Sequence, residues 1–161
     1  MSINYRRLKN DYPEFDSFSE MIDFAAEKYG SKTAFEYIDN DIHSISFDKF
    51  RDHISAVASF FKNKGLKNEN IALLGANSYE YIVVFYGILC SGNIAVPICK
   101  DLDMDDLEVI LNDCAPSFVV ILDGVRTQQA DIISLAKNSE IANMDKVRKL
   151  WNLMESLHLI V

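Results

Sequence analysis

The chain has 161 residues, of which 49% are hydrophobic and 25% charged, the composition of one soluble globular domain. Its 24 acidic and 16 basic residues give a net charge of −8, and no stretch clusters lysine or arginine. Proteins that bind nucleic acid use such clusters to contact phosphates, so the charge argues against a nucleic-acid partner.

No stretch combines a basic start, an apolar core and a small-residue cleavage site, so we predict a cytoplasmic protein. The three cysteines, Cys90, Cys99 and Cys114, are odd in number, widely spaced and surrounded by apolar residues. This pattern predicts buried, reduced thiols rather than a disulfide or a metal site.

The N-terminal region predicts a surface segment followed by a capped helix. Residues 1–16 are polar and aromatic, which predicts a leader that lies on the surface. Ser17 precedes Glu20 by three positions, the spacing of a capping box. Apolar residues then recur at helical spacing up to Tyr29, and Gly30 is placed to end the helix.

A hairpin and a second helix are predicted next. The β-prone runs 33–38 and 42–47 flank the turn-forming sequence Asp-Asn-Asp, which predicts a small β-hairpin. Ser46 then caps a helix that Gly65 closes. Its apolar stripe consists of Phe47, Phe50, Ile54, Val57, Ala58 and Phe61.

Residues 81–99 carry no charge and are nearly long enough to span a membrane. Ser91-Gly92-Asn93 interrupts this run with residues that favour turns. We therefore prefer a strand over 71–75, a buried helix over 81–90 and a second strand over 94–98, and keep the membrane span as an alternative. The preferred interpretation is a βαβ unit at the centre of an α/β domain.

The remaining chain continues the alternation of helices and strands. Asp103 and the two acidic residues after it start a helix that ends before Pro116, and residues 118–122 form a third apolar strand. Weaker patterns predict a helix over 130–136, a helix over 147–154 capped near Asn143, and a fourth buried strand over 157–161. The predicted fold class is α/β, a layered, mostly parallel sheet flanked by helices, with a small hairpin near the N-terminus. Because the chain stops on a buried apolar strand, we expect it to be the front piece of a longer protein.

A search for chemistry gives few candidates. No glycine-rich phosphate loop is present, and no serine has the flanking residues of a nucleophile elbow. His43, His53 and His158 lie far apart, and His53 is predicted on the polar surface of its helix. The acidic group at 101–106 is predicted to be a solvated helix start rather than a metal site. We therefore predict no metal site and no catalytic residue.

The aromatic residues Tyr79, Tyr81, Phe85 and Tyr86 could line a tunnel for an apolar ligand, but packing into the core explains them better.

Asn77 and Ser78 are the candidate binding residues. They fall where a predicted strand ends and a helix begins, and ligands of open α/β sheets gather at such places. Helix capping explains the same residue types, so binding is the weaker of the two interpretations.

Several of these stretches resemble the adenylate-forming enzymes, also called AMP-dependent synthetases and ligases. Residues 17–35 are similar to the opening helix and first strand of that family, with Gly30, Lys32, Ala34 and Phe35 at its spacer positions. Ile45-Ser-Phe-Asp-Lys-Phe resembles the strand that leads into a long helix, and Gly65-Leu-Lys its end.

The stronger resemblance lies over residues 70–98. Asn70-Ile-Ala-Leu-Leu-Gly-Ala-Asn-Ser matches a family strand and the Asn-Ser before a helix, and Gly87 to Ile98 matches that helix's turn into Val-Pro. Residues 107–120 resemble the helix and strand that follow. Within the family, residues 96–102 look most like fatty-acyl-CoA ligases.

The resemblance, which covers roughly residues 15–122, implies that residues 1–161 are the N-terminal subdomain of an AMP-binding domain of the acyl-CoA synthetase-like fold. Full-length members join a carboxylate to ATP with Mg²⁺, release pyrophosphate and pass the acyl-adenylate to a thiol, usually of CoA. The family's Pro-Lys-terminated phosphate loop, its later acidic residues and its C-terminal lysine have no counterpart here. The resemblance therefore implies a fragment that is inactive alone, whose partners are the rest of the enzyme and a fatty-acid substrate.

The alternative is a stand-alone binding module of the flavodoxin-like type, without catalytic activity. In either case an exposed sheet edge could support self-association.

Overall fold

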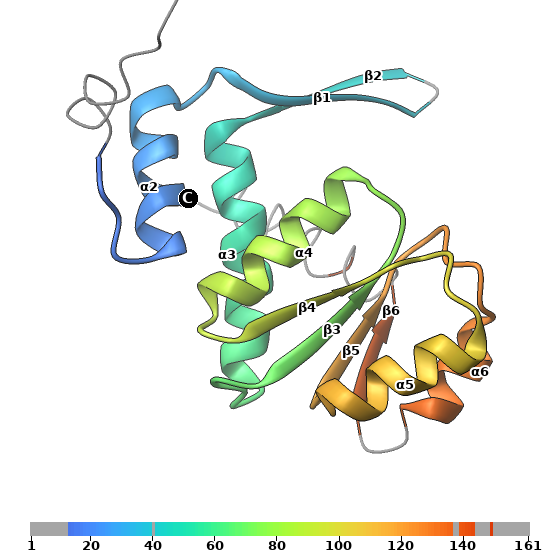
Figure 1. The fold of residues 1–161 in the computed structure, drawn as a ribbon. Helices are drawn as coiled ribbons and strands as arrows, with labels where there is room; N and C mark the ends of the chain where they lie inside the picture. The colour runs from blue at the N-terminus through green and yellow to red at the C-terminus, as the bar shows by residue number, and fades with distance from the viewer. Residues whose placement is uncertain (1–12, 40, 137–138, 144–148, 150–161) are drawn as a thin grey trace, which may run out of the picture.

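The structure is a computed structural model that describes residues 13–39, 41–136, 139–143 and 149 (Figure 1). The elements within those residues are, in chain order, α2 (Phe18–Tyr29), β1 (Thr33–Asp39), β2 (Asp41–Ser46), α3 (Phe47–Asn63), β3 (Asn70–Leu74), α4 (Tyr79–Cys90), β4 (Ile94–Ile98), α5 (Met104–Cys114), β5 (Phe118–Ile121), α6 (Gln129–Leu135) and β6 (Glu140–Asn143).

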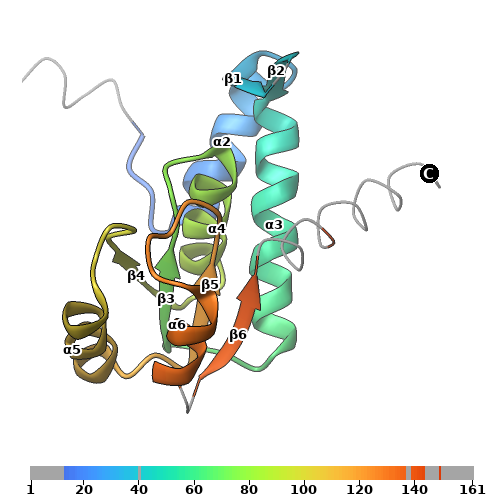
Figure 2. The ribbon, with the colours of Figure 1, turned by 90° about the vertical axis from the view of Figure 1, so that its right-hand side faces the viewer.

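Strands β3 to β6 form a parallel sheet in the order β4-β3-β5-β6. Successive residues of a strand point to opposite faces. Ile71 and Leu73 of β3 join the core that contains residues of α3 and α4, whereas Ala72 and Leu74 join the core that contains residues of α5 and α6. Figure 2 shows α3 and α5 on opposite sides of the sheet. The predicted layered α/β fold with a parallel sheet is confirmed.

The helix starts predicted from polar residues are confirmed by their hydrogen bonds. In each case the side chain of the cap accepts from the backbone N–H three residues later, at 3.1 to 3.2 Å. These caps are Ser17 of α2, Ser46 of α3, Ser78 of α4 and Asp103 of α5. Each bond satisfies one of the N–H groups that a helix leaves without an internal partner.

A buried asparagine builds the turn that interrupts the uncharged stretch 81–99. The carboxamide of Asn93 donates to the carbonyl oxygen of Leu66 (3.2 Å) and accepts from the N–H of Glu69 (3.0 Å). Gly92, at φ +78°, takes the left-handed conformation that the turn requires. Helix α4 therefore ends after 12 residues. Among the described residues, no helix has the length and apolar character needed to cross a bilayer.

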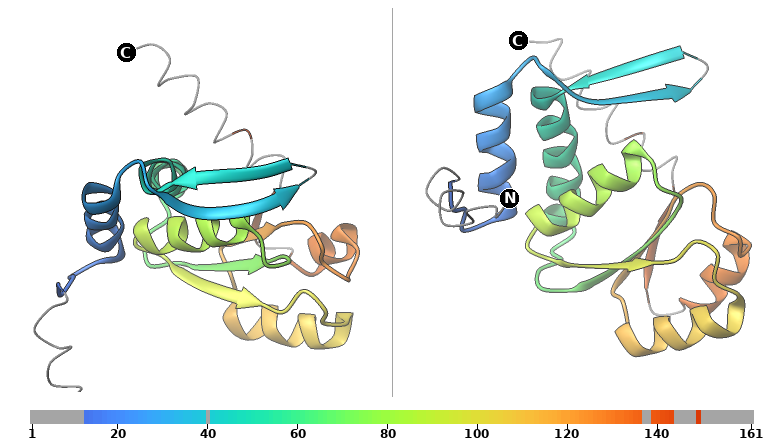
Figure 3. Two further views of the ribbon diagram at one scale, coloured as in Figure 1. Left: turned by 90° about the horizontal axis from the view of Figure 1, so that it is seen from above. Right: turned by 45° about the horizontal axis from the view of Figure 1, so that its top comes forward.

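The predicted hairpin is confirmed as β1 and β2, which pair antiparallel with Phe35 opposite Ile45 and Ile38 opposite Ile42. It lies over α4 and close to the start of α3 (Figure 3). Phe35 and Tyr37 pack their rings against Tyr79, the first residue of α4, at centroid distances of 5.6 and 5.8 Å. The hairpin is thus fixed to α4 by aromatic contacts on one face.

The prediction that His53 lies on the surface was wrong. His53 is only 6% exposed, and its Nδ1 lies 2.8 Å from the hydroxyl of Tyr79. Helix α3 is packed against α2, α4 and the hairpin, so its buried side is wider than the predicted apolar stripe. A polar ring can occupy this wider side because a hydroxyl from another helix meets it.

The prediction of buried thiols was also wrong in part. Cys90 and Cys114 are half-buried, Cys99 is exposed, and all three are free. Burial raises the pKa of the Cys90 and Cys114 thiols, which favours their protonated form. Cys99 follows the last residue of β4, and β4 is an edge strand of the sheet, so no described strand lies beside Cys99 on its outer side.

The C-terminal part contains a strand that the sequence did not predict. Asn143, near which a helix cap was expected, is the last residue of β6, which pairs with β5 through Phe118 opposite Glu140 and Ile121 opposite Asn143. The sequence of β6 has no clear strand pattern, so its conformation comes from pairing with β5. Most of the predicted leader, the helix over 147–154 apart from residue 149, the strand over 157–161 and His158 lie outside the described residues.

Candidate functional site

The candidate site is the edge of the sheet where the parallel strands end. Parallel strands bring their carboxyl ends to one edge, and ligands of open α/β sheets bind there. Here the loops after β3, β4 and β5 and the last residue of β6 meet.

A hollow of about 580 Å³ lies at the ends of β3 and β4. Its lining includes the predicted candidate Asn77, together with Gly75, Ala76, Tyr81, Pro97, Ile98, Cys99, Lys100 and Asp101. The lining is mainly apolar and includes the polar side chains of Asn77, Lys100 and Asp101. An apolar wall with a few polar groups suits an organic molecule or a polypeptide segment better than a bare ion.

The two predicted candidates have different roles. Ser78 is the N-cap of α4, and its hydroxyl accepts from the N–H of Tyr81 at 3.1 Å. Asn77 is exposed at the hollow, and it forms no cap bond in the described structure. The capping interpretation therefore holds for Ser78, while Asn77 remains the candidate that faces the hollow.

The charged groups of the hollow compensate each other. Lys100 donates from Nζ to Oδ1 of Asp101 at 2.7 Å, and both side chains are solvent-accessible. Asp103 caps α5 as expected for a helix start. Among the described residues, no group of three or more histidine, cysteine, aspartate or glutamate side chains is arranged to hold a metal ion.

The crevice between β3 and β5 is the topological switch point of this sheet. From β3 the chain crosses by α4 to β4, and from β5 it crosses by α6 to β6 on the other side. Doubly wound folds bind their ligands in this crevice. An open crevice at this point would therefore favour the alternative of a flavodoxin-like module, and a closed crevice would argue against it.

Two backbone hydrogen bonds and two glycines close the switch point. The N–H of Ala76 donates to the carbonyl of Asp123 (2.9 Å), and that of Leu122 to the carbonyl of Leu74 (2.8 Å). A Cβ on Gly75 would lie 2.7 Å from Cβ of Leu122, and one on Gly124 would lie 2.7 Å from Cβ of Ala76. The two loops are in contact, so no ligand fits between them.

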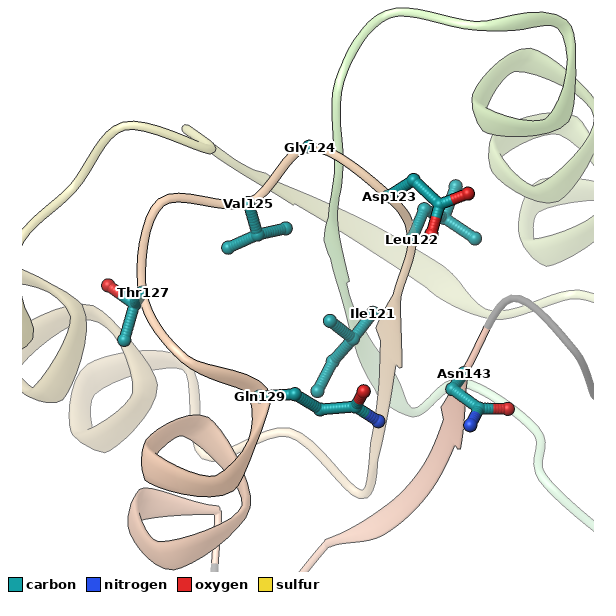
Figure 4. Close-up of a pocket in the computed structure, with 8 residues that line it drawn as sticks. All are labelled: Ile121, Leu122, Asp123, Gly124, Val125, Thr127, Gln129 and Asn143. Carbon is teal, nitrogen blue, oxygen red and sulfur yellow. The ribbon is translucent and has the colours of Figure 1, made fainter.

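A smaller pocket of about 250 Å³ lies on the far side of β5 (Figure 4). The loop after β5 surrounds it, and Gln129 and Asn143 bring carboxamides to its rim. Thr127 donates its hydroxyl to the carbonyl of Leu102 at 3.0 Å, so part of its polar lining is used to hold the loop. This pocket offers less space and less apolar wall than the hollow.

The aromatic residues of α4 divide between core and site. Tyr79 is buried, and burial raises its pKa, so the phenol stays protonated beside His53. Tyr81 is half-buried and lines the hollow, and burial raises its pKa as well. The core prediction therefore holds for Tyr79, which is buried, and also for Tyr81, Phe85 and Tyr86, which are half-buried and pack against the same core.

Sequence reasoning missed most of the hollow. Pro97 and Ile98 were assigned to the end of a strand, and no binding site was predicted at Cys99 and Lys100, which follow them. The one available signal was that β3 and β4, as the two strands of a βαβ unit, place their carboxyl ends side by side.

Comparison with known proteins gives a family and a fold. The model of the family described as AMP-binding enzyme matches residues 22–157. Crotonobetaine/carnitine–CoA ligase from Salmonella paratyphi A is 32% identical over 104 residues, covering 63% of this chain and 20% of the ligase. Long-chain-fatty-acid–AMP ligase FadD32 from Mycobacterium marinum is 25% identical over 118 residues, covering 68% of this chain and 19% of the relative. The chain thus spans about a fifth of the length of these two relatives.

Solved structures agree on the fold. The N-terminal domain of FACL13 from Mycobacterium tuberculosis superposes with a TM-score of 0.75 at 19% identity, covering 86% of this chain and 36% of that one. VinN gives a TM-score of 0.76 at 17% identity, covering 89% of this chain and 36% of that one.

Proposed function

The chain belongs to the AMP-binding enzyme family, and on this basis we propose that residues 1–161 are the N-terminal subdomain of an ATP-dependent acyl-CoA ligase. The complete enzyme would activate a fatty acid as its acyl-adenylate and transfer the acyl group to CoA. A relative named a long-chain-fatty-acid–AMP ligase supports the fatty acid, and one named a CoA ligase supports the acceptor.

The observation that carries the proposal is the difference in length between this chain and its relatives. The family model covers most of this chain, yet the chain covers only about a fifth of the CoA ligase and of the long-chain-fatty-acid–AMP ligase. The whole ligase would use ATP, Mg²⁺ and CoA. The described residues do not fit these groups, because the switch point is closed, no glycine-rich loop is present and no acidic cluster could hold a metal.

In this proposal the chain supplies a scaffold and one wall of the substrate site, and the hollow beside Asn77 is that wall. Adenylate formation needs cationic and backbone groups that stabilise the charge on the transferring phosphoryl group. Since the sequence has no glycine-rich phosphate loop to supply such groups, we expect no adenylate formation by the chain alone.

The test is an assay of pyrophosphate release by the isolated chain with ATP, Mg²⁺ and either dodecanoate or hexadecanoate. The expected rate equals that of a sample of heat-denatured chain. Release that depends on fatty acid and exceeds this blank would show that the chain is a complete catalyst, and the proposal would be wrong.

Two further parts of the proposal concern the chain's surroundings. The three free thiols support a reducing compartment, so we propose that the protein is cytoplasmic.

Self-association would use β6 rather than β4. Ile94 donates its N–H to the carbonyl of Glu69, the residue before β3. Pro97, three residues later in β4, therefore faces the outer edge, and proline has no N–H to offer a new strand.

A flavodoxin-like module is the less favoured function. Such a module would bind its ligand at the switch point, which is the part of the carboxyl edge that the loops after β3 and β5 close.

A further inference from the structure

Helix α4 has the composition of a helix that is enclosed on every side. Of its 12 residues only Glu80 is charged, and the others are aliphatic, aromatic, glycine or cysteine. A helix that is apolar all round is normally buried in the interior of a larger structure.

The inner side of α4 is buried as expected. Val83, Val84 and Ile88 are at most 1% exposed. A Cβ on Gly87 would lie 2.5 Å from Cγ1 of Val57, so α3 and α4 are in close contact at this glycine. Figure 1 shows α4 between the hairpin and the sheet, which cover it above and below.

The opposite side of α4 has no such cover from the described elements. Tyr81, Ile82, Phe85 and Leu89 recur at helical spacing along it, and each is only half-buried. We call these four residues the α4 outer face. It continues into the hollow, because Tyr81 lines the hollow together with Pro97 and Cys99.

We propose that the α4 outer face is the surface on which the rest of the adenylate-forming domain packs, through an apolar segment that follows the part aligned with this chain. The inference rests on the proposed function. It also rests on coverage, because the superposition takes in 86% of this chain but only 36% of a solved chain described as an N-terminal domain. Nearly two thirds of that domain therefore lie outside the part that is equivalent to this chain, and they must pack against that part or extend beyond it.

The charge of the chain argues against a lipid surface as the occupant. Membrane-binding helices surround their apolar side with lysine and arginine, which anionic lipids attract. Here the net charge is −8, the one charged residue of α4 is acidic, and Lys100 beside the hollow is paired with Asp101.

The experiment co-expresses the full, affinity-tagged chain with the part of the FACL13 N-terminal domain that follows the aligned segment. Co-purification is measured for the unchanged chain, for Phe85→Glu, for Leu89→Gln and for Val109→Glu. Val109, on α5, is 68% exposed and lies away from the α4 outer face, so it is the matched control. Circular dichroism shows whether each variant keeps its helices.

We expect the unchanged chain and Val109→Glu to retain the complement in about equal amounts. Folded Phe85→Glu should retain about tenfold less, the change expected for loss of one aromatic anchor, and Leu89→Gln should lie between. Equal retention by Phe85→Glu and Val109→Glu would overturn the proposal. So would a homodimer of the unchanged chain that Phe85→Glu abolishes, or binding to phosphatidylcholine–phosphatidylglycerol vesicles that Phe85→Glu abolishes.

A second measurement covers the case of an insoluble complement. The same segment is joined to the C-terminus of the chain, and the rate at which N-ethylmaleimide modifies Cys99 is compared with that in the chain alone. A rate about tenfold lower in the joined protein supports the docking, and an unchanged rate contradicts it. Neither readout depends on catalysis, so a failure of docking is distinguishable from pyrophosphate release by the chain alone.

Discussion

Helices α4 and α5 each connect strands of the same sheet, yet their surfaces differ. Helix α5 buries Leu107 and Leu111 and exposes Asp105, Asp106 and Glu108, so it is an ordinary amphipathic helix that faces water. Helix α4 buries one side equally well but carries aromatic and aliphatic residues on the other. One face of the sheet is therefore covered by a helix whose outer side faces water. The other is covered by a helix whose outer side is apolar and suited to contact with more polypeptide.

The largest expected effect concerns the two sides of α4 itself. Ile88→Ala removes a fully buried side chain and should lower the free energy of unfolding by about 3 kcal/mol. Leu89→Ala, on the half-buried outer face, should cost about 1 kcal/mol. Urea denaturation measures both, and equal costs would show that the two sides are not different environments.

The contact between α3 and α4 at Gly87 gives the next effect. Gly87→Ala places a methyl group against Val57 and should cost about 2 kcal/mol of stability. Adding Val57→Ala should cancel part of the steric cost in a double-mutant cycle. Gly65→Ala is the control: nothing lies within 4 Å there, so only the strain of its positive φ, about 1 kcal/mol, is expected.

The start of α4 distinguishes capping from binding. Ser78→Ala removes the bond to the N–H of Tyr81 and should cost about 1 kcal/mol. Asn77→Ala should change stability by less than about 0.5 kcal/mol, because Asn77 is exposed and does not cap. Thermal denaturation of the two variants side by side measures this, and a larger cost for Asn77→Ala would reverse the assignment.

The smallest effect is expected on α5. Val109→Glu adds a charge to a side chain that is already exposed and should change stability by less than about 0.5 kcal/mol. Phe85→Glu should cost more, since Phe85 packs at the edge of the core. If Val109→Glu destabilised the chain as much as Phe85→Glu, the contrast between the two helices would be lost.

Local patterns predicted the elements that local chemistry determines. The caps Ser17, Ser46 and Ser78 follow from a hydroxyl placed before a helical pattern, and β3 follows from an apolar run buried on both faces. The turn at Asn93 was visible in the same way, because polar and glycine residues interrupt an apolar stretch.

Features that depend on distant segments were not predictable. His53 is buried because the hydroxyl of Tyr79, 26 residues later, meets its ring. The closed switch point depends on the fit of Gly75 to Leu122 and of Gly124 to Ala76, which no spacing in the sequence encodes. The hollow likewise required the loops after β3 and β4 to be placed together, so only Asn77 of its lining was identified as a site residue in advance.

The most direct test of the account is the amount of FACL13 complement that Phe85→Glu retains relative to Val109→Glu. If α5 faces water and the α4 outer face packs on the rest of the domain, the expected ratio is about one to ten. A ratio of one, with both variants folded, would mean that the α4 outer face faces water in the complete protein and that the central claim is wrong.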